Sequence, residues 1–306
     1  MVLVADPAGH PLHQGFANRR PIYPHILHPR FPRVYGHCGH MIHLENVAFS
    51  YSPQAPFVLR GLTLSIENQS WVAVTGPDGA GKTTLGKVIC GLLEPMSGSV
   101  RFSSPQDEAS VSAGYLGGDP YDSLVGTSVE EDIIFGLENM QLSPSEMEIR
   151  LRQALRWTSL IGMEKRLIHT LSGGEQQKLA LAATLAMGCR IIVVDEGLNM
   201  LDRPTRLSVR SLLSSLRANP GLTVIEITQN FQDAFAADRI LFFSEGTILF
   251  DGTAAGFFCS QQGRDWASLT GGTAALRAGL VARRLVSANC LDTSKLSSCL
   301  MNMFRK

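Results

Sequence analysis

The sequence has no stretch of 18 or more apolar residues, which is the length that a membrane-spanning helix requires. Proline and histidine interrupt the apolar residues at the N-terminus, which argues against a signal peptide. The chain also lacks a charge excess, since 27 Lys and Arg residues balance 27 Asp and Glu residues. We therefore expect no nucleic-acid partner.

The cysteines are few and show no paired pattern. None of the six belongs to a CxxC pair, and their spacing does not suggest a disulfide framework. This favours a reduced, cytosolic setting. A chain of 306 residues, 44% of them apolar, can bury the core of one large domain or two modest domains.

Residues 1–40 differ in composition from the rest of the chain. They contain six of the eight histidines and six of the 15 prolines, without helical or strand periodicity. We predict a disordered tail over 1–40. Metal binding by these histidines is the less favoured alternative, because their spacing is irregular. Regular patterning starts at Met41, which makes Met41 a candidate start of the native chain.

Residues 41–255 are predicted to form one domain in which strands alternate with helices. Residues 127–187 are mostly helical by pattern, and 256–306 are predicted to form a short helical extension, with Leu276, Leu280 and Leu285 as its apolar positions. The other predicted elements are strands 42–49, 62–66, 71–75, 191–195 and 222–228, helices 84–93, 204–218 and 231–236, and a hairpin over 239–250 that turns at Glu245-Gly246. This order predicts an α/β fold with a largely parallel sheet and an added antiparallel sheet.

A glycine-rich segment follows the predicted strand 71–75 directly. It fits the phosphate-loop pattern G-x-x-x-x-G-K-[ST] and precedes a predicted helix. Glycines let several backbone N–H groups converge on phosphate oxygens, and the helix N-terminus adds positive potential. Lys82 would reach the β- and γ-phosphates of ATP, and the Thr83 hydroxyl would bind Mg²⁺. The predicted nucleotide-binding residues here are Gly76, Pro77, Asp78, Gly79, Ala80, Gly81, Lys82, Thr83 and Thr84.

Two carboxylates follow the apolar run Ile191–Val194. Such a run is typical of a central parallel strand that is buried on both faces. We predict that Asp195 holds Mg²⁺ through water and that Glu196 is the general base that activates the attacking water.

A third motif lies between the phosphate loop and these carboxylates. It consists of Leu171, Ser172, Gly173, Gly174, Glu175 and Gln176, followed by Gln177 and Lys178. Together with Phe49-Ser50-Tyr51 and the segment 125–139, it makes residues 41–252 resemble the ATP-binding subunits of ABC transporters. The resemblance is strongest to those of energy-coupling factor (ECF) and cobalt/nickel-type uptake systems. It implies a P-loop NTPase core with an antiparallel β subdomain and a helical subdomain that carries the third motif.

The resemblance also implies partners and further roles. In this family the LSGGEQQ-type segment binds the ATP held by a second ATP-binding subunit, so we expect a homo- or heterodimer. Tyr51 is expected to stack on adenine, and Asp202 falls in the D-loop, where Asn199 and Arg203 replace the commoner Ser and Pro. Transmembrane subunits would hold the chain at the cytoplasmic face of the membrane, where it would energise import of a metal ion or vitamin.

Two positions depart from the family pattern. Relatives carry Phe-Gln-Asn-Pro where this chain has Gly117-Gly118-Asp119-Pro120, so Gly118 replaces a glutamine that contacts Mg²⁺ and water. Relatives also have a histidine after the strand that ends near Thr228, where this chain has Gln229, and the last histidine of the chain is His169. Losing one such donor commonly costs about 10²–10³ in rate. We therefore expect slow turnover at this chain's own ATP site, with Gln229 in the catalytic position and Asp119 as a conceivable substitute for the glutamine.

Two alternatives to a hydrolysing transporter subunit are open. The chain could be a regulatory ATP-binding subunit that completes a partner's active site, which the two departures favour and the retained Glu196 opposes. A soluble ABC protein of translation or DNA repair is less favoured. The chain has one phosphate loop, no long heptad run and no basic patch.

Overall fold

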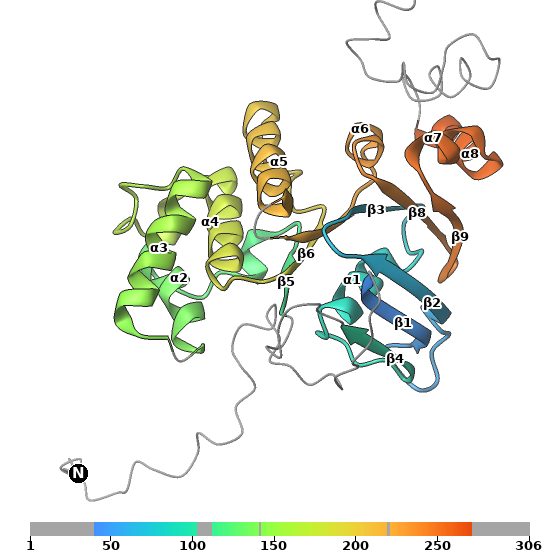
Figure 1. The fold of residues 1–306 in the computed structure, drawn as a ribbon, viewed down its shortest axis with the longest axis horizontal. Helices are drawn as coiled ribbons and strands as arrows, with labels where there is room; N and C mark the ends of the chain where they lie inside the picture. Colours follow the sequence, from blue (N-terminus) through green and yellow to red (C-terminus); the bar gives the residue numbers. More distant parts are fainter. Residues whose placement is uncertain (1–39, 103–111, 141, 219–220, 271–306) are drawn as a thin grey trace, which may run out of the picture.

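The computed structural model describes residues 40–102, 112–140, 142–218 and 221–270. Residues 1–39 of the predicted tail and the three leucines named for the C-terminal extension lie outside these ranges. The described residues form a central sheet, a smaller antiparallel sheet and a group of helices at one end (Figure 1).

The central sheet is parallel except at one edge. Its strand order is β5-β6-β7-β3-β8-β9, and only β9 runs antiparallel to its neighbour. Its strands are β3 (Trp71–Thr75), β5 (Ala113–Leu116), β6 (Ile191–Asp195), β7 (Thr223–Ile227), β8 (Arg239–Ser244) and β9 (Thr247–Gly252). The largely parallel sheet and the hairpin that turns at Glu245-Gly246 are thereby confirmed.

Burial on both faces explains why the central strands are continuous apolar runs. In β6, Ile192 and Val194 belong to one hydrophobic core, and Ile191 and Val193 belong to another. Successive side chains of a strand point to opposite faces, so a strand between two cores needs apolar residues at every position.

The smaller sheet has the order β2-β1-β4 and is antiparallel, as predicted. It consists of β1 (His40–Phe49), β2 (Leu59–Glu67) and β4 (Ser97–Phe102). Its inward side chains share a core with helix α1 (Lys82–Ile89) and one face of the central sheet. This sheet therefore supports the helix that follows the glycine-rich loop.

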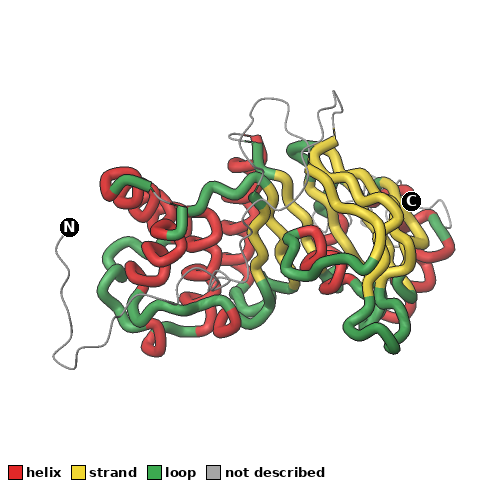
Figure 2. Tube along the Cα trace, turned by 90° about the horizontal axis from the view of Figure 1, so that it is seen from below, coloured by secondary structure: helices red, strands yellow, loops and turns green. Residues whose placement is uncertain are grey.

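Helices α2 (Val129–Glu138), α3 (Pro144–Thr158) and α4 (Gly173–Ala186) form a subdomain with its own core. Figures 1 and 2 show this helical group at one end of the molecule, beside β5 and β6. The remaining helices are α5 (Arg203–Ala218), α6 (Phe231–Phe235), α7 (Ala254–Cys259) and α8 (Gln261–Thr270), with 3₁₀ turns η1 (Pro120–Asp122) and η2 (Ile168–Thr170). No helix in the described part of the chain has the length and apolar character needed to span a membrane.

Several details differ from the sequence-based expectation. The helix predicted over 84–93 begins at Lys82 and ends at Ile89, because Gly91 adopts a left-handed conformation (φ 62°) just past the helix end. Strands β4 and β5 were not predicted. Both are short and carry glycine, and neither shows a clear alternation of apolar and polar residues.

Helix α7 spans the predicted boundary at residue 255. Phe257 is completely buried against Phe242, Phe250 and Trp266, within one of the two cores of the central sheet. We therefore propose that the domain that starts near residue 41 continues through α8.

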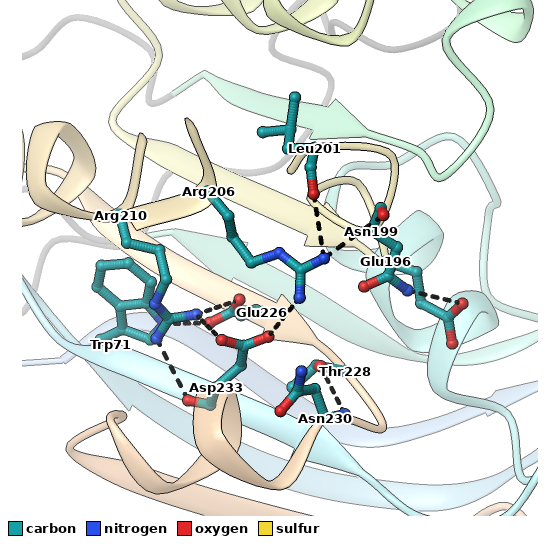
Figure 3. A network of polar contacts seen from close by, with 10 residues as sticks. All are labelled: Trp71, Glu196, Asn199, Leu201, Arg206, Arg210, Glu226, Thr228, Asn230 and Asp233. Atoms are coloured by element: carbon teal, nitrogen blue, oxygen red, sulfur yellow. Dashed lines mark hydrogen bonds and ion pairs between the residues drawn. The ribbon is translucent and has the colours of Figure 1, made fainter. Parts of the chain in front are cut away.

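Glu226 in β7 is the centre of a buried cluster of charged side chains. The Glu226 carboxylate in β7 accepts a hydrogen bond from Nε1 of Trp71 (2.8 Å) and pairs with Arg210 of α5 (Figure 3). Arg210 also pairs with Asp233 at 3.3 Å, and its guanidinium lies 4.7 Å from the Trp71 ring centre. Burial raises the pKa of Glu226, and the cation of Arg210 opposes this shift.

Arg210→Met should lower the free energy of unfolding by about 3–5 kcal/mol, because it leaves the buried Glu226 charge without its cation. When a carboxylate has a higher pKa in the folded state than in the unfolded state, the free energy of unfolding falls as pH rises through the folded-state pKa. The loss should therefore be larger at pH 8 than at pH 5.5, as measured by urea unfolding at both pH values. The double variant Arg210→Met/Glu226→Gln should recover part of it, and an equal loss at both pH values would contradict the assignment.

Candidate functional site

The loop between β3 and α1 has a backbone that only glycine can supply. Gly76 has φ 141°, and a Cβ there would lie 2.0 Å from the carbonyl oxygen of Phe243. Gly81, the N-cap of α1, has φ 103°. The loop therefore curls tightly at the N-terminus of a helix, where backbone N–H groups and the helix dipole favour an anion.

Lys82 lies buried at the base of this loop. Its Nζ donates hydrogen bonds to the carbonyl oxygens of Gly76 (2.8 Å) and Pro77 (2.7 Å). Burial lowers the pKa of Lys82, and the nearby carboxylates of Asp78, Glu196 and Asp195 oppose this shift. The loop cation thus faces the same carboxylates that the sequence predicts for metal binding and proton transfer.

The two carboxylates follow β6 in different environments. Asp195 is buried, and its Oδ2 accepts a hydrogen bond from the Tyr115 hydroxyl at 2.6 Å. Glu196 is half-buried and adopts a left-handed conformation (φ 53°), which costs about 1–3 kcal/mol for a non-glycine residue. Its Oε2 accepts a hydrogen bond from Nδ2 of Asn199 at 3.4 Å (Figure 3). Such strain often marks a functional residue.

Gly118 lies beside both carboxylates. A Cβ at this position would lie 3.6 Å from the Asp195 carbonyl oxygen and 3.8 Å from Cβ of Glu196, so a side chain would have room. The neighbouring Asp119, the conceivable substitute for the glutamine, has a structural role. Its Oδ1 accepts a hydrogen bond from the backbone N–H of Tyr121 (2.9 Å) and caps η1.

Gln229 reaches the glycine-rich loop from the end of β7. Its Nε2 donates a hydrogen bond to Oδ1 of Asp78, and Asp78 lies 4.0 Å from Nζ of Lys82. An uncharged amide therefore lies where the resemblance predicts a histidine.

Tyr51 stands next to the first turn of α1. Its hydroxyl lies 3.1 Å from Oγ1 of Thr84, and its ring packs edge-on against Phe49 with centroids 5.0 Å apart. The residue is still 62% exposed, so a large aromatic surface remains open beside the loop.

The third motif forms the N-terminus of α4. Ser172 and Glu175 make a capping box, in which Oγ of Ser172 accepts from the Glu175 N–H and Glu175 Oε2 accepts from the Ser172 N–H (2.7 Å). A Cβ at Gly173 would meet nothing within 4 Å, and the nearest atoms to one at Gly174 are 3.8 Å away. Nothing in the described part of this chain therefore requires glycine at either position.

The helix of the third motif is tied to the segment that carries Gly118. Nε2 of Gln177 donates to the carbonyl oxygen of Gly117 (2.9 Å), and Nε2 of Gln176 donates to the Tyr121 hydroxyl (3.0 Å). These links, and the contacts of Tyr115 and Asn199, were missed from the sequence, because they depend on which strands and turns are neighbours.

Asp202, which was predicted to lie in the D-loop, precedes α5. Its Oδ1 accepts a hydrogen bond from the N–H of Thr205 at 3.2 Å, and hydrogen bonding to Thr205 lowers its pKa. The residues nearest to Gly174 across the fold are Met200 and Leu201 of the same loop. The third motif therefore lies beside the D-loop.

The structure brings most predicted site residues together at the carboxyl ends of the parallel strands, where open α/β sheets bind ligands. This group comprises the glycine-rich loop, Asp195, Glu196, Gly118, Gln229 and Tyr51. Within the described residues, no hydrogen bond or ion pair joins Ser172, Gly173 or Gly174 to the loop. The third motif is thus outside this group.

The residues present fit a magnesium nucleotide. Mg²⁺ prefers hard oxygen ligands, and the exposed Thr83 hydroxyl and the Asp195 carboxylate supply them beside a phosphate-binding loop. Buried Lys82 supplies a positive charge at the same place.

Comparisons with known proteins agree with this geometry. Residues 59–199 match the family model described as ABC transporter. The energy-coupling factor transporter ATP-binding protein EcfA1 of Ligilactobacillus salivarius is 36% identical over 229 residues, which cover 72% of this chain and 80% of that protein. EcfA1 of Enterococcus faecalis is also 36% identical over 229 residues, covering 72% and 82%. The structure of cbiO1 from Clostridium perfringens, part of the ABC transporter complex cbiONQ, is 25% identical with a TM-score of 0.64, covering 80% of this chain and 99% of that one.

Tyr51→Ala should weaken ATP binding by about 5- to 150-fold, because stacking of a base on an aromatic ring is worth about 1–3 kcal/mol. Titration of a fluorescent ATP analogue at equilibrium would measure the effect. Tyr51→Phe, the matched control, keeps the ring and loses only the hydroxyl contact with Thr84, so it should bind like the wild type. Equal weakening in both variants would assign the effect to the hydroxyl instead.

Proposed function

Because the chain belongs to the ABC transporter ATP-binding family, we propose that it is the ATPase subunit that energises an importer of the energy-coupling factor type. Relatives of 36% identity carry that name, and both are matched over at least 80% of their length. The observation that carries the proposal is the convergence of the glycine-rich loop, Asp195 and Glu196 at one edge of the sheet.

The residues of this edge have distinct proposed roles. Backbone N–H groups of the loop and Nζ of Lys82 hold the β- and γ-phosphates of ATP. Glu196 accepts a proton from the attacking water. Thr83 and Asp195 would hold Mg²⁺, which neutralises charge that develops on the phosphates.

We also propose that the third motif acts on ATP held by a second ATP-binding subunit. Gly173 and Gly174 leave the start of α4 uncovered, although no neighbour among the described residues requires glycine there. Such a helix N-terminus suits an anion brought by another molecule, because the capping box engages the N–H groups of Ser172 and Glu175 but not those of Gly173 and Gly174. Head-to-tail pairing of two subunits would join each glycine-rich loop to the other subunit's Ser172.

A groove on the helical subdomain is the proposed docking site for transmembrane subunits. It encloses about 440 Å³ between α2 and residues 165–167. Its lining combines apolar Ile134, Phe135 and Leu167 with Glu130, Glu131, Glu138 and Lys165. Docking there would hold the chain at the cytoplasmic face of the membrane. We propose that the transporter imports a metal ion or vitamin, as the sequence resemblance implies.

The chain's own ATP site is proposed to turn over slowly. Gly118 offers no side chain beside Asp195 and Glu196, and Gln229 offers an amide instead of an imidazole. The same two positions favour a second candidate function, in which this chain is a regulatory subunit whose third motif completes a partner's site. Purified chain that hydrolyses ATP rapidly as a homodimer would exclude this second candidate.

Mixing two inactive variants tests the pairing. Lys82→Ala disables the loop and Ser172→Arg disables the third motif, so each variant alone should lack ATPase activity. An equimolar mixture should regain about a quarter of the wild-type rate, because half of the dimers are mixed and each mixed dimer has one complete site. The measurement is phosphate release after the subunits have exchanged. No recovery would mean that the chain pairs with a different subunit.

Restoring the two altered side chains tests the slow site. Gln229→His should raise kcat by roughly 10²–10³-fold with little change in ATP affinity, because an imidazole that can carry a positive charge replaces an uncharged amide that is bonded to Asp78. Gly118→Gln should raise kcat further, since the position has room for a side chain. Asn230→His, which puts the same imidazole one residue along, should change neither quantity. An unchanged rate in Gln229→His would show that this position does not limit turnover.

A further inference from the structure

A tyrosine reaches Asp195 from the neighbouring strand. Tyr115 lies on β5, where it pairs with Val193, two residues before Asp195 on β6. Its hydroxyl donates a hydrogen bond of 2.6 Å to Oδ2 of Asp195. Both residues are only 7% exposed, so little water competes for this bond.

The Tyr115 ring is held on two sides. A Cβ at Gly86 would lie 3.6 Å from its Cε2, and a Cβ at Gly117 would lie 3.5 Å from its Cε1. Gly86 belongs to α1, the helix that starts with Lys82, and Gly117 begins the segment that carries Gly118. The Tyr115 ring therefore packs between α1 and the segment that carries Gly118, and these two elements hold it in place.

The direction of the hydrogen bond is fixed by chemistry. A carboxylate oxygen has no hydrogen to donate, so the Tyr115 hydroxyl donates and Oδ2 of Asp195 accepts. A phenylalanine would fill the same space without this bond, and a buried carboxylate oxygen would then lose a donor.

We propose that Tyr115 is a positioning residue for the metal-binding carboxylate, an inference that rests on the proposed ATPase function. By engaging Oδ2, it restricts the rotation of the Asp195 carboxylate and leaves Oδ1 free of this bond, so that Oδ1 would be available to the water through which Asp195 would hold Mg²⁺. Partners that orient metal ligands from outside typically account for about 10- to 100-fold in metal affinity.

Tyr115→Phe tests this role, and Tyr121→Phe is the matched control. Both variants lose one phenol oxygen, but the Tyr121 hydroxyl contacts Gln176 and not Asp195. The dissociation constant of Mn²⁺, measured by electron paramagnetic resonance with a non-hydrolysable ATP analogue present, should rise about 10- to 100-fold in Tyr115→Phe. It should stay at the wild-type value in Tyr121→Phe. Affinity for the analogue without metal should be unchanged in both.

Steady-state kinetics separate positioning from a general structural defect. In Tyr115→Phe the Mg²⁺ concentration for half-maximal ATPase activity should rise, while kcat at saturating Mg²⁺ stays near the wild-type value. A fall in kcat that excess Mg²⁺ does not restore would overturn the proposed role.

The outcomes also distinguish this inference from the proposed function. Wild-type Mn²⁺ affinity in Tyr115→Phe, together with lost affinity in Asp195→Asn, would overturn the inference and leave the ATPase function intact. If the wild-type chain bound neither Mn²⁺ nor the analogue, the proposed function itself would fail, and the inference with it.

Discussion

The buried carboxylate of Glu226 is the constraint on which the arrangement of the site depends. It lies in β7, between the strand that leads to Glu196 and the strand that leads to the glycine-rich loop. Trp71 at the start of β3 and Arg210 of α5 both contact it. A buried charge tolerates little displacement of its partners, because any unpaired state is costly. One ionic cluster thus ties β3 to β7, the strands that lead to the glycine-rich loop and to Gln229.

The same cluster extends to Glu196, the proposed general base. Arg206 of α5 lies 3.8 Å from Asp233, and its guanidinium donates to the carbonyl oxygens of Leu201 (3.3 Å) and Asn199 (3.4 Å), while the Asn199 amide donates to Glu196 (Figure 3). The Asn199 substitution that was noted as a departure in the D-loop thus has a consequence. The Asn199 side chain is longer than the commoner serine, and its amide donates directly to Glu196. The same loop also lies beside Gly174. Hydrogen bonds thus link the loop beside the third motif to Glu196.

The sequence predicted those parts of the molecule whose signal is local. Strands β3 and β6 were predicted to the residue, since both are apolar runs buried on two faces, and the glycine-rich loop follows from its own backbone demands. The features that the sequence did not predict depend on which elements are neighbours in space. The bond between Tyr115 and Asp195 requires that β5 lie next to β6, and β5 itself carries no alternation that predicts a strand. Likewise, the Asp119 side chain caps η1, and the sequence did not predict this turn.

The position of Gly118 shows which part of the altered site has been retained. Its segment is still anchored to the helical subdomain, because Gln177 holds the Gly117 carbonyl and Gln176 holds Tyr121. The side chain that would touch the metal and water is absent, whereas the backbone path from the ATP site to α4 is present. The hydrogen bonds of Gln177 and Gln176 therefore still connect the Gly118 segment to α4, although position 118 has no side chain to meet the nucleotide. The Tyr115 ring, which packs between Gly86 of α1 and Gly117, is a further contact between the helix that follows the glycine-rich loop and this segment.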